Sequence, residues 1–332
     1  MARKKSRVLC VTAALAAFLL FLPLSSAKAE VVLKMVTAWP KGAVDNKTLE
    51  MFLEEVDSLV AKKCPGELKI NLVGGPEAVK TMDQVTAAQK GMVDLVHTTN
   101  AYYVSLLPEA DAMKLSDFTP WEERANGAWE YYNKLHEKVG IYFLANLNMG
   151  IKFQMYLLKP TDKADLKGFN IRVSPMYLQV IKGLGGNPVV IPPPDIYTAL
   201  ERKVVDGYCW LSVGIRDYGW EKITKYIAGP TFYTAVHPIV VNLNTWQKLA
   251  PKYRDLLTEA AKNSESKVMP YYLAQEKDER AKLLAAGLQV IKWAPEETEK
   301  FLKVADDEGW KDVISKCPQT GPELRKLLTK KK

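Results

Sequence analysis

The sequence predicts an α/β fold in two lobes, each a mostly parallel sheet flanked by helices, joined by crossing strands and a long helix. Segments with strand alternation take turns with segments of helical spacing, and this order favours parallel strands with crossover helices. The pattern occurs twice, with no internal repeat and no low-complexity linker between the two sets. A helical region at 251–287 is long enough to contact both lobes.

The first 29 residues have the pattern of an export signal. The basic start MARKKSR precedes the apolar run VLCVTAALAAFLLFLPL, and SSAKA ends in the small-x-small pattern that signal peptidases read. We expect cleavage between Ala29 and Glu30, with an uncleaved membrane anchor as the alternative. Nothing after residue 30 is long and apolar enough to span a bilayer. The sequence therefore predicts a periplasmic, soluble mature protein.

Charge gives no support for a nucleic-acid partner. The chain of 332 residues carries a formal net charge of +8. Five of these charges lie in the predicted signal: Arg3, Lys4, Lys5, Arg7 and Lys28. The remaining +3 is too small to indicate nucleic-acid binding, and the basic C-terminal TKKK is a short solvated tail.

Cysteine and histidine usage predicts neither a metal site nor a cofactor. No CxxC pair occurs, and the chain has only three histidines. Cys64 and Cys317 both lie in polar sequence at helix ends, and an oxidising compartment allows a disulfide between them. Cys209, between Tyr208 and Trp210, is expected to be a buried thiol.

The first set of elements begins with a strand at 31–39, which Pro40 ends. A helix at 46–64 follows, with Leu49, Phe52 and Val56 on one face. The remaining elements of this set are a strand at 67–75, a helix at 81–91, a strand at 92–99, a helix at 121–139 and a strand at 141–149.

The second set has strands near 151–158, 169–174, 189–191 and 205–210, and helices at 177–184 and 195–202. A strand at 237–246 leads into the helical region at 251–287, where Pro270 is expected to bend or break the helix. A strand at 288–294 and a helix at 296–305 complete the pattern. We expect lobe I to comprise 30–149 plus about 240–270, and lobe II 150–239 plus about 271–332.

One strand carries an unexpected cation. In GFNIRVSP (168–175), apolar and polar residues alternate, and Arg172 lies near the carboxyl end of the half-buried strand. Ligands of open α/β sheets bind at the carboxyl ends of strands. Arg172 therefore has two interpretations: a ligand contact, or a structural ion pair with an internal acid such as Asp206.

Other polar and aromatic residues also lie where the predicted strands end. Each can be explained by packing or solvation alone, but together they predict a small-ligand cleft between two facing sheets. The candidate residues are Trp39, Glu77, Asn100, Asn148, Lys152, Arg172, Tyr208 and Trp210.

Catalysis has little support in the sequence. No G-x-S-x-G, H-E-x-x-H or P-loop pattern occurs, and GLGGNP (183–188) has Pro188 where a dinucleotide fingerprint needs glycine. His97 and His237 border apolar strands and are more often hydrogen-bonded core residues than catalysts. We expect a protein that is not an enzyme, with a periplasmic α/β enzyme acting on a carboxylic acid as the alternative.

The run DLKGFNIRVSPMYLQVIKGLGGNPVVIPPPDIYTALERKVVDGYCW (165–210) resembles the signature segment of the solute-binding proteins of TRAP (tripartite ATP-independent periplasmic) transporters, the DctP-type family. The shared pattern is a D-L-K-G-x-x-x-R-V strand, G-x-N-P-V, an acidic-x-Y-T-A-L helix and V-D-G. The resemblance continues through EEVDSLVAKKCPGELKINLVGG, AAQKGMVDL and HPIVVNLNTWQKLAPKYRDLLTEAA, and so covers nearly the whole mature chain.

The resemblance implies a two-lobed, hinged periplasmic-binding-protein fold. Such a receptor closes on an organic acid and delivers it to small and large membrane subunits; a receptor that feeds a sensor is the alternative. In that family the arginine of the R-V strand pairs with the ligand carboxylate, and Arg172 occupies this position. A second basic residue, often arginine, opens the second lobe, where this chain has Lys152. Lysine lacks the planar fork of arginine.

Two departures from the family pattern bear on the ligand. V-D-G is followed by Tyr208, Cys209 and Trp210 where many members place an amide, and Pro192–Pro194 replace a P-F-S-type sequence. With Trp39 on the other lobe, an aromatic sandwich becomes possible. We hypothesise a monomeric receptor for a monocarboxylate with an aromatic or bulky apolar body, such as an aromatic keto acid or an indole or aryl acid. The alternative ligand is a small hydroxy- or dicarboxylate.

Overall fold

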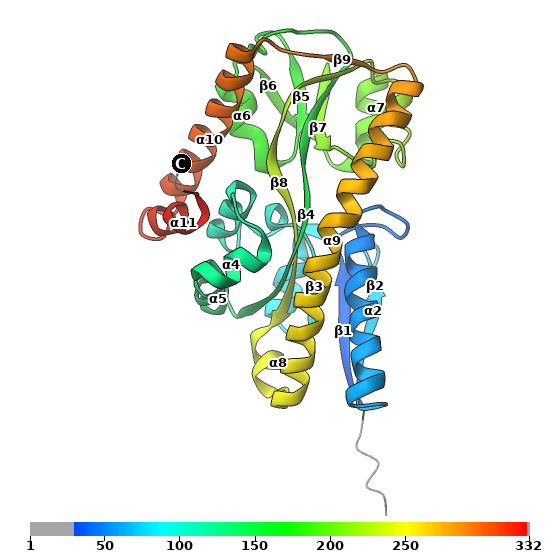
Figure 1. Cartoon of the computed structure of the whole chain (residues 1–332), viewed down its shortest axis with the longest axis vertical. Helices are drawn as coiled ribbons and strands as arrows, with labels where there is room; N and C mark the ends of the chain where they lie inside the picture. Colours follow the sequence, from blue (N-terminus) through cyan, green and yellow to red (C-terminus); the bar gives the residue numbers. More distant parts are fainter. Residues whose placement is uncertain (1–29, 331–332) are drawn as a thin grey trace, which may run out of the picture.

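A computed structural model describes residues 30–330, so the predicted signal at 1–29 lies outside the described residues. The chain forms one sheet of nine strands in the order β2-β1-β3-β8-β4-β7-β5-β6, with β9 paired to β8 (Figure 1). The strands are β1 (Val31–Thr37), β2 (Leu68–Gly74), β3 (Leu95–His97), β4 (Ile141–Leu157), β5 (Asn170–Val173), β6 (Asn187–Val190), β7 (Gly207–Leu211), β8 (Tyr226–Asn242) and β9 (Gln289–Ile291).

The sheet has two parallel ends and an antiparallel centre. β1 pairs in parallel with β2 and β3, and β5 pairs in parallel with β6 and β7. The 17-residue strands β4 and β8 are antiparallel to each other and run through both halves (Figure 1). We call the half built on β1–β3 lobe I and the half built on β5–β7 lobe II. The predicted two-lobed α/β class is confirmed.

Helices cover the sheet on both faces. They are α2 (Asn46–Lys63), α3 (Gln84–Gln89), α4 (Pro120–Asn126), α5 (Ala128–Lys138), α6 (Leu178–Gly183), α7 (Ile196–Glu201), α8 (Leu243–Lys248), α9 (Pro251–Ala285), α10 (Pro295–Lys316) and α11 (Gly321–Leu328). Short 3₁₀ helices are η1 (Thr81–Asp83), η2 (Asn100–Tyr102), η3 (Pro108–Leu115), η4 (Pro175–Tyr177), η5 (Pro193–Asp195) and η6 (Trp220–Lys222). Within residues 30–330, no helix combines the length and apolar character needed to cross a membrane.

The differences from the predicted elements include those at β4, β8 and α9. The strands expected at 141–149 and 151–158 are one strand, β4, because Gly150 (φ 69°) and shifts in the pairing with β8 accommodate the break. β8 begins at Tyr226 rather than at 237. α9 continues through Pro270 and contacts both α2 and β4 (Figure 1).

The C-terminal helix α11 packs on lobe I, so the assignment of 271–332 to lobe II is wrong for this segment. Leu324 and Leu328 lie in one apolar cluster with Trp129 and Phe143. The backbone N–H of Asp117 also donates to the Leu328 carbonyl (2.9 Å). α10 contacts α6 of lobe II and η3 of lobe I, and so returns the chain to lobe I.

The predicted disulfide between Cys64 and Cys317 is wrong, since both are buried free thiols. Cys64 ends α2 and packs in the same apolar cluster as β1 residues. Cys317 ends α10, beside Glu109 of η3. α2 and α10 lie on opposite sides of the molecule (Figure 1). A disulfide requires the two Cα atoms to approach within about 7 Å, which similar local sequence does not ensure.

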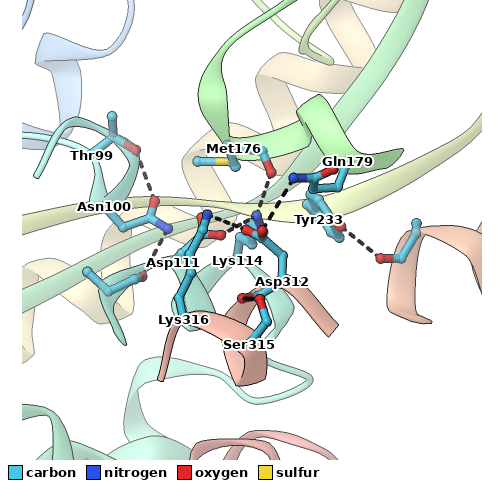
Figure 2. A network of polar contacts seen from close by, with 12 residues as sticks. Thr99, Asn100, Asp111, Lys114, Met176, Gln179, Tyr233, Asp312, Ser315 and Lys316 are labelled. Carbon is cyan, nitrogen blue, oxygen red and sulfur yellow. Dashed lines mark hydrogen bonds and ion pairs between the residues drawn. The ribbon is translucent and has the colours of Figure 1, made fainter. Parts of the chain in front are cut away.

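A buried polar network joins the two lobes (Figure 2). Lys114 on η3 is 3% exposed, and its Nζ lies 2.7 Å from Asp111 Oδ2. The same ammonium donates to the carbonyl of Met176 on η4 of lobe II and lies 4.9 Å from the ring centroid of Tyr233. Next to it, Gln179 of lobe II donates to Asp312 on α10 (3.4 Å). Lys114 therefore ties η3 to η4 across the boundary between the lobes.

Lys114→Met is expected to lower the free energy of unfolding by about 3 kcal/mol, because it leaves Asp111 buried without its cation. Urea unfolding measures the loss, and small-angle scattering is expected to show a more open molecule. Lys311→Met is the matched control, since the Lys311 side chain pairs with Glu308 and is itself 73% exposed. Exposed ion pairs contribute less than about 1 kcal/mol. Equal effects of the two substitutions would contradict a structural role for the network.

Candidate functional site

A cavity of about 40 Å³ lies where the two lobes meet. Lobe I and the segments next to it contribute Trp39, Asp45, Thr99, Ala101 and Tyr102. Lobe II contributes Arg172, Ser174, Met176, Tyr177, Trp210 and Leu211, and the long strands contribute Phe153 and His237. This volume has room for about three water molecules. The lobes are thus close together around a narrow, largely aromatic space.

Arg172 reaches the cavity from β5 and is 2% exposed. Its Nε donates to the Ile191 carbonyl (2.8 Å), and its Nη1 donates to the Tyr177 hydroxyl (3.0 Å) and the Cys209 carbonyl (3.3 Å). All three acceptors are uncharged. Within residues 30–330, Nη2 makes no hydrogen bond and no carboxylate lies within ion-pair distance of the guanidinium.

Asp206, the internal acid considered as a structural partner, pairs with another residue. Its Oδ1 lies 3.0 Å from Lys159 Nζ, and its Oδ2 accepts from the Asn170 backbone N–H (2.9 Å). The structural interpretation of Arg172 as an ion pair with Asp206 is therefore wrong. The guanidinium remains a buried charge without a counter-ion in the described part of the chain, which is costly unless an anion enters the cavity.

The position of Arg172 is set by its neighbours. The Tyr177 hydroxyl accepts from the guanidinium and donates to the Cys209 carbonyl (2.7 Å). The Trp210 ring centroid lies 5.3 Å from the guanidinium carbon, within the range of a cation–π interaction. A cation held in one orientation by neutral groups can form parallel hydrogen bonds with a carboxylate.

Two tryptophans from opposite lobes line the cavity. Trp39 is 4% exposed and packs on His237 and His97, with ring centroids 4.3 Å and 4.8 Å away. Trp210 packs edge-on against Trp220 (4.9 Å), and its buried Nε1–H has no hydrogen-bond partner in the described residues. The cavity therefore has aromatic walls from both lobes.

The lobe I side of the cavity holds a buried carboxyl group. Asp45 Oδ1 lies 3.4 Å from His237 Nε2, while Asp45 Oδ2 is buried without a partner in residues 30–330. Burial raises the pKa of Asp45 to about 7 and lowers the pKa of His237 to about 3. Near about pH 6, both side chains are therefore mainly uncharged.

Of the eight residues predicted to bind ligand, the structure brings Arg172, Trp39 and Trp210 together. Lys152 is exposed and lines a separate cavity with Lys114 and Asp306. Tyr208 is fully buried, with its hydroxyl 2.8 Å from Thr224 Oγ1 and its ring stacked on Tyr156.

The other three predicted residues lie outside the cavity and stabilise local backbone. Glu77 Oε1 accepts from the Gly75 N–H (2.7 Å), and Asn148 Oδ1 accepts from the Gly150 N–H (2.8 Å). Asn100 Nδ2 donates to the Ala110 carbonyl (3.2 Å). Short polar side chains at strand ends form such turns as readily as they contact ligands.

Asp45 and His237 are lining residues that the sequence did not identify. Asp45 immediately precedes α2, a position typical of a helix cap, yet its side chain makes no capping hydrogen bond. In the sequence, Asp45 follows the end of the same strand as Trp39. This position is the signal that could have identified Asp45 as a lining residue. His237 was expected to be a core residue; it is buried, but it also lines the cavity.

Comparisons with known proteins found relatives in both sequence and structure. A 2-oxoacid-binding periplasmic protein for monocarboxylates from Nostoc sp. strain PCC 7120 is 26% identical over 291 residues, covering 82% of this chain and 77% of the relative. A TRAP transporter solute-binding protein from Bordetella bronchiseptica RB50, with calcium and picolinate bound, has a TM-score of 0.76 at 23% identity, covering 90% of this chain and 92% of that one.

A Bordetella pertussis extracytoplasmic solute receptor binding pyroglutamic acid has a TM-score of 0.78 at 17% identity, covering 90% of this chain and all of that one. At these identities the solved structures establish the shared fold. The family match extends over residues 36–316, from β1 to the end of α10. The chain therefore belongs to the bacterial extracellular solute-binding proteins of family 7, the DctP family of TRAP transporter receptors.

Proposed function

We propose that this protein is a periplasmic, non-enzymatic receptor that binds an organic monocarboxylate between its lobes and delivers it to the membrane subunits of a TRAP transporter. The observation that carries this proposal is the buried guanidinium of Arg172, which has no acidic partner within residues 30–330 and lines the cavity between the lobes. A ligand carboxylate supplies the missing negative charge.

The charges of the cavity favour one carboxylate rather than two. Among the described residues that line the cavity, Arg172 is the only permanently charged side chain. Lys152, the second basic residue suggested by the family resemblance, lies in another cavity. A dicarboxylate would bring a second buried negative charge without a cation to balance it, beside the carboxyl group of Asp45.

The walls favour an apolar ligand body. Trp39, Tyr102 and Trp210 face the cavity together with Phe153 and Tyr177, so a flat ring could stack between aromatic side chains. An aromatic keto acid or an indole or aryl acid is therefore the first candidate.

A short 2-oxo monocarboxylate is the second candidate. The narrow volume of the cavity favours a small body, and the Nostoc relative is named for binding 2-oxoacids. Either ligand would contact lobe II through Arg172 and lobe I through Trp39 or Tyr102. Contacts with both lobes stabilise the closed state relative to the open one, which is how binding can drive hinge closure.

Arg172→Ala is expected to weaken acid binding about 100-fold, because the bound carboxylate loses its charged hydrogen bonds. The measurement is the ligand-induced increase in melting temperature across a panel of organic acids. Lys152→Ala is the matched control, and its melting-temperature increase is expected to equal that of the wild type. An unchanged response of Arg172→Ala would refute the proposed site, whereas loss in both variants would assign a ligand contact to Lys152.

Tryptophan fluorescence is expected to separate the ligand classes, because Trp39 and Trp210 line the cavity. Phenylpyruvate and indole-3-acetate should quench emission and compete with each other, while malate should do neither. Quenching by pyruvate alone would identify the short oxo acid as ligand. Binding restricted to C4 dicarboxylates would contradict the monocarboxylate proposal.

Two further alternatives have direct tests. Incubation of a bound acid with the protein is expected to return the acid unchanged, whereas a product would indicate an enzyme. Reading frames for small and large membrane subunits beside the gene would support transport, and a neighbouring sensor would support signalling instead.

A further inference from the structure

Within residues 30–330, only one oxygen of the Asp45 carboxyl group has a partner. Asp45 is 2% exposed and lines the same cavity as Arg172. Its side chain does not cap α2, although it occupies the capping position. Its Oδ1 faces His237, but its Oδ2 has no partner in the described chain. A buried polar atom without a partner, on a residue that lines a ligand cavity, is a candidate for contact with that ligand.

Burial destabilises the ionised form of Asp45 more than its own backbone N–H stabilises it. The ionisable groups around it are His237 and His97 from β8 and β3, Asp217 and Tyr218 after β7, Tyr102 on η2 and Tyr272 on α9. Burial keeps both histidines neutral by lowering their pKa. The nearby Arg216 is engaged with Glu279 (3.7 Å). Asp217 opposes a second negative charge.

The charge of the bound complex also favours the protonated form of Asp45. Arg172 can balance one carboxylate, and the ligand of the proposed function brings that carboxylate. An ionised Asp45 would then leave the buried cavity with a net negative charge, which is unfavourable in a medium of low dielectric constant. Asp45 is therefore neutral when the acid is bound, and a neutral carboxyl group carries one O–H donor.

We propose that protonated Asp45 donates a hydrogen bond from Oδ2 to a carbonyl oxygen of the bound acid, and so makes the receptor selective for oxo acids. This inference rests on the proposed function, since it assumes that Arg172 binds the carboxylate. The acid then bridges the lobes, with its carboxylate on lobe II and its oxo group on lobe I. An acid without the oxo oxygen loses the polar contact with lobe I and leaves the O–H of Asp45 unpaired.

The same residue links binding to pH. Burial raises the pKa of Asp45 to about 7, so the free protein loses this proton above that pH. Because the complex needs the protonated form, oxo-acid affinity is expected to fall with rising pH, by about tenfold per pH unit once the pH exceeds the pKa. Below about pH 6 the affinity should be constant, since Asp45 is already protonated there.

Matched acids test the selectivity. Calorimetry at about pH 6 compares pyruvate with propionate and phenylpyruvate with 3-phenylpropionate, because each pair differs in the oxo oxygen. The wild type is expected to prefer the oxo acid by about tenfold. Asp45→Ala should abolish this preference. Asp45→Asn should retain it, since the amide N–H is also a donor, and this variant differs least from the wild type in shape.

Proton uptake tests the protonation state independently. At about pH 8, calorimetry of pyruvate or phenylpyruvate in buffers of different ionisation enthalpy should show uptake of about one proton by the wild type. Asp45→Asn should take up none, and its affinity should be constant between about pH 6 and pH 8. The proton uptake of Asp45→Asn still tests the proposal if Asp45→Ala fails to fold.

The outcomes separate this inference from the proposed function. If Arg172→Ala abolishes binding while Asp45→Ala keeps the wild-type preference for oxo acids, the carboxylate site stands and the role of Asp45 is refuted. Unchanged proton uptake by Asp45→Asn refutes it as well. If the wild type binds none of the four acids but binds another monocarboxylate of the panel, the proposed function stands and the selectivity for oxo acids is refuted.

Discussion

The structure depends on a buried positive charge that has no counter-ion within residues 30–330. Arg172 is held by the Ile191 and Cys209 carbonyls and the Tyr177 hydroxyl, which are all neutral. These groups orient the guanidinium but do not balance its charge. An arriving carboxylate does both, and water exclusion on closure strengthens the pair. The loaded receptor therefore gains an ion pair on closing that the empty receptor lacks.

The sheet allows this because its two long central strands belong to both lobes. β4 and β8 pair along their length, with shifts in register around Gly150, and connect the parallel strands on either side (Figure 1). Two strands that cross between domains can flex while keeping the lobes aligned. Lys114 adds a polar tie between η3 and η4, next to the cavity-lining Met176 (Figure 2). Closure is thus supported by contacts on two sides of the cleft.

The site prediction succeeded where the direction of a side chain follows from its neighbours in the sequence. Arg172 alternates with apolar residues on a short regular strand, so its place at the strand end was predictable. Lys152 follows the irregularity at Gly150, where the pairing with β8 shifts between Asn148 and Lys152. A bulge redirects the side chains after it. No pattern in the sequence shows that Lys152 lines a different cavity.

The sequence by itself determined most of the order of strands and helices, the parallel crossover pattern within each lobe, the unusual arginine of β5 and the family resemblance. These features depend on residues close together in the chain. Only the tertiary structure decided which distant residues meet. It places Asp45 and Arg172 on one cavity, keeps Cys64 apart from Cys317, and returns α11 to lobe I. Such contacts arise from the packing of whole elements against one another, so no local periodicity encodes them.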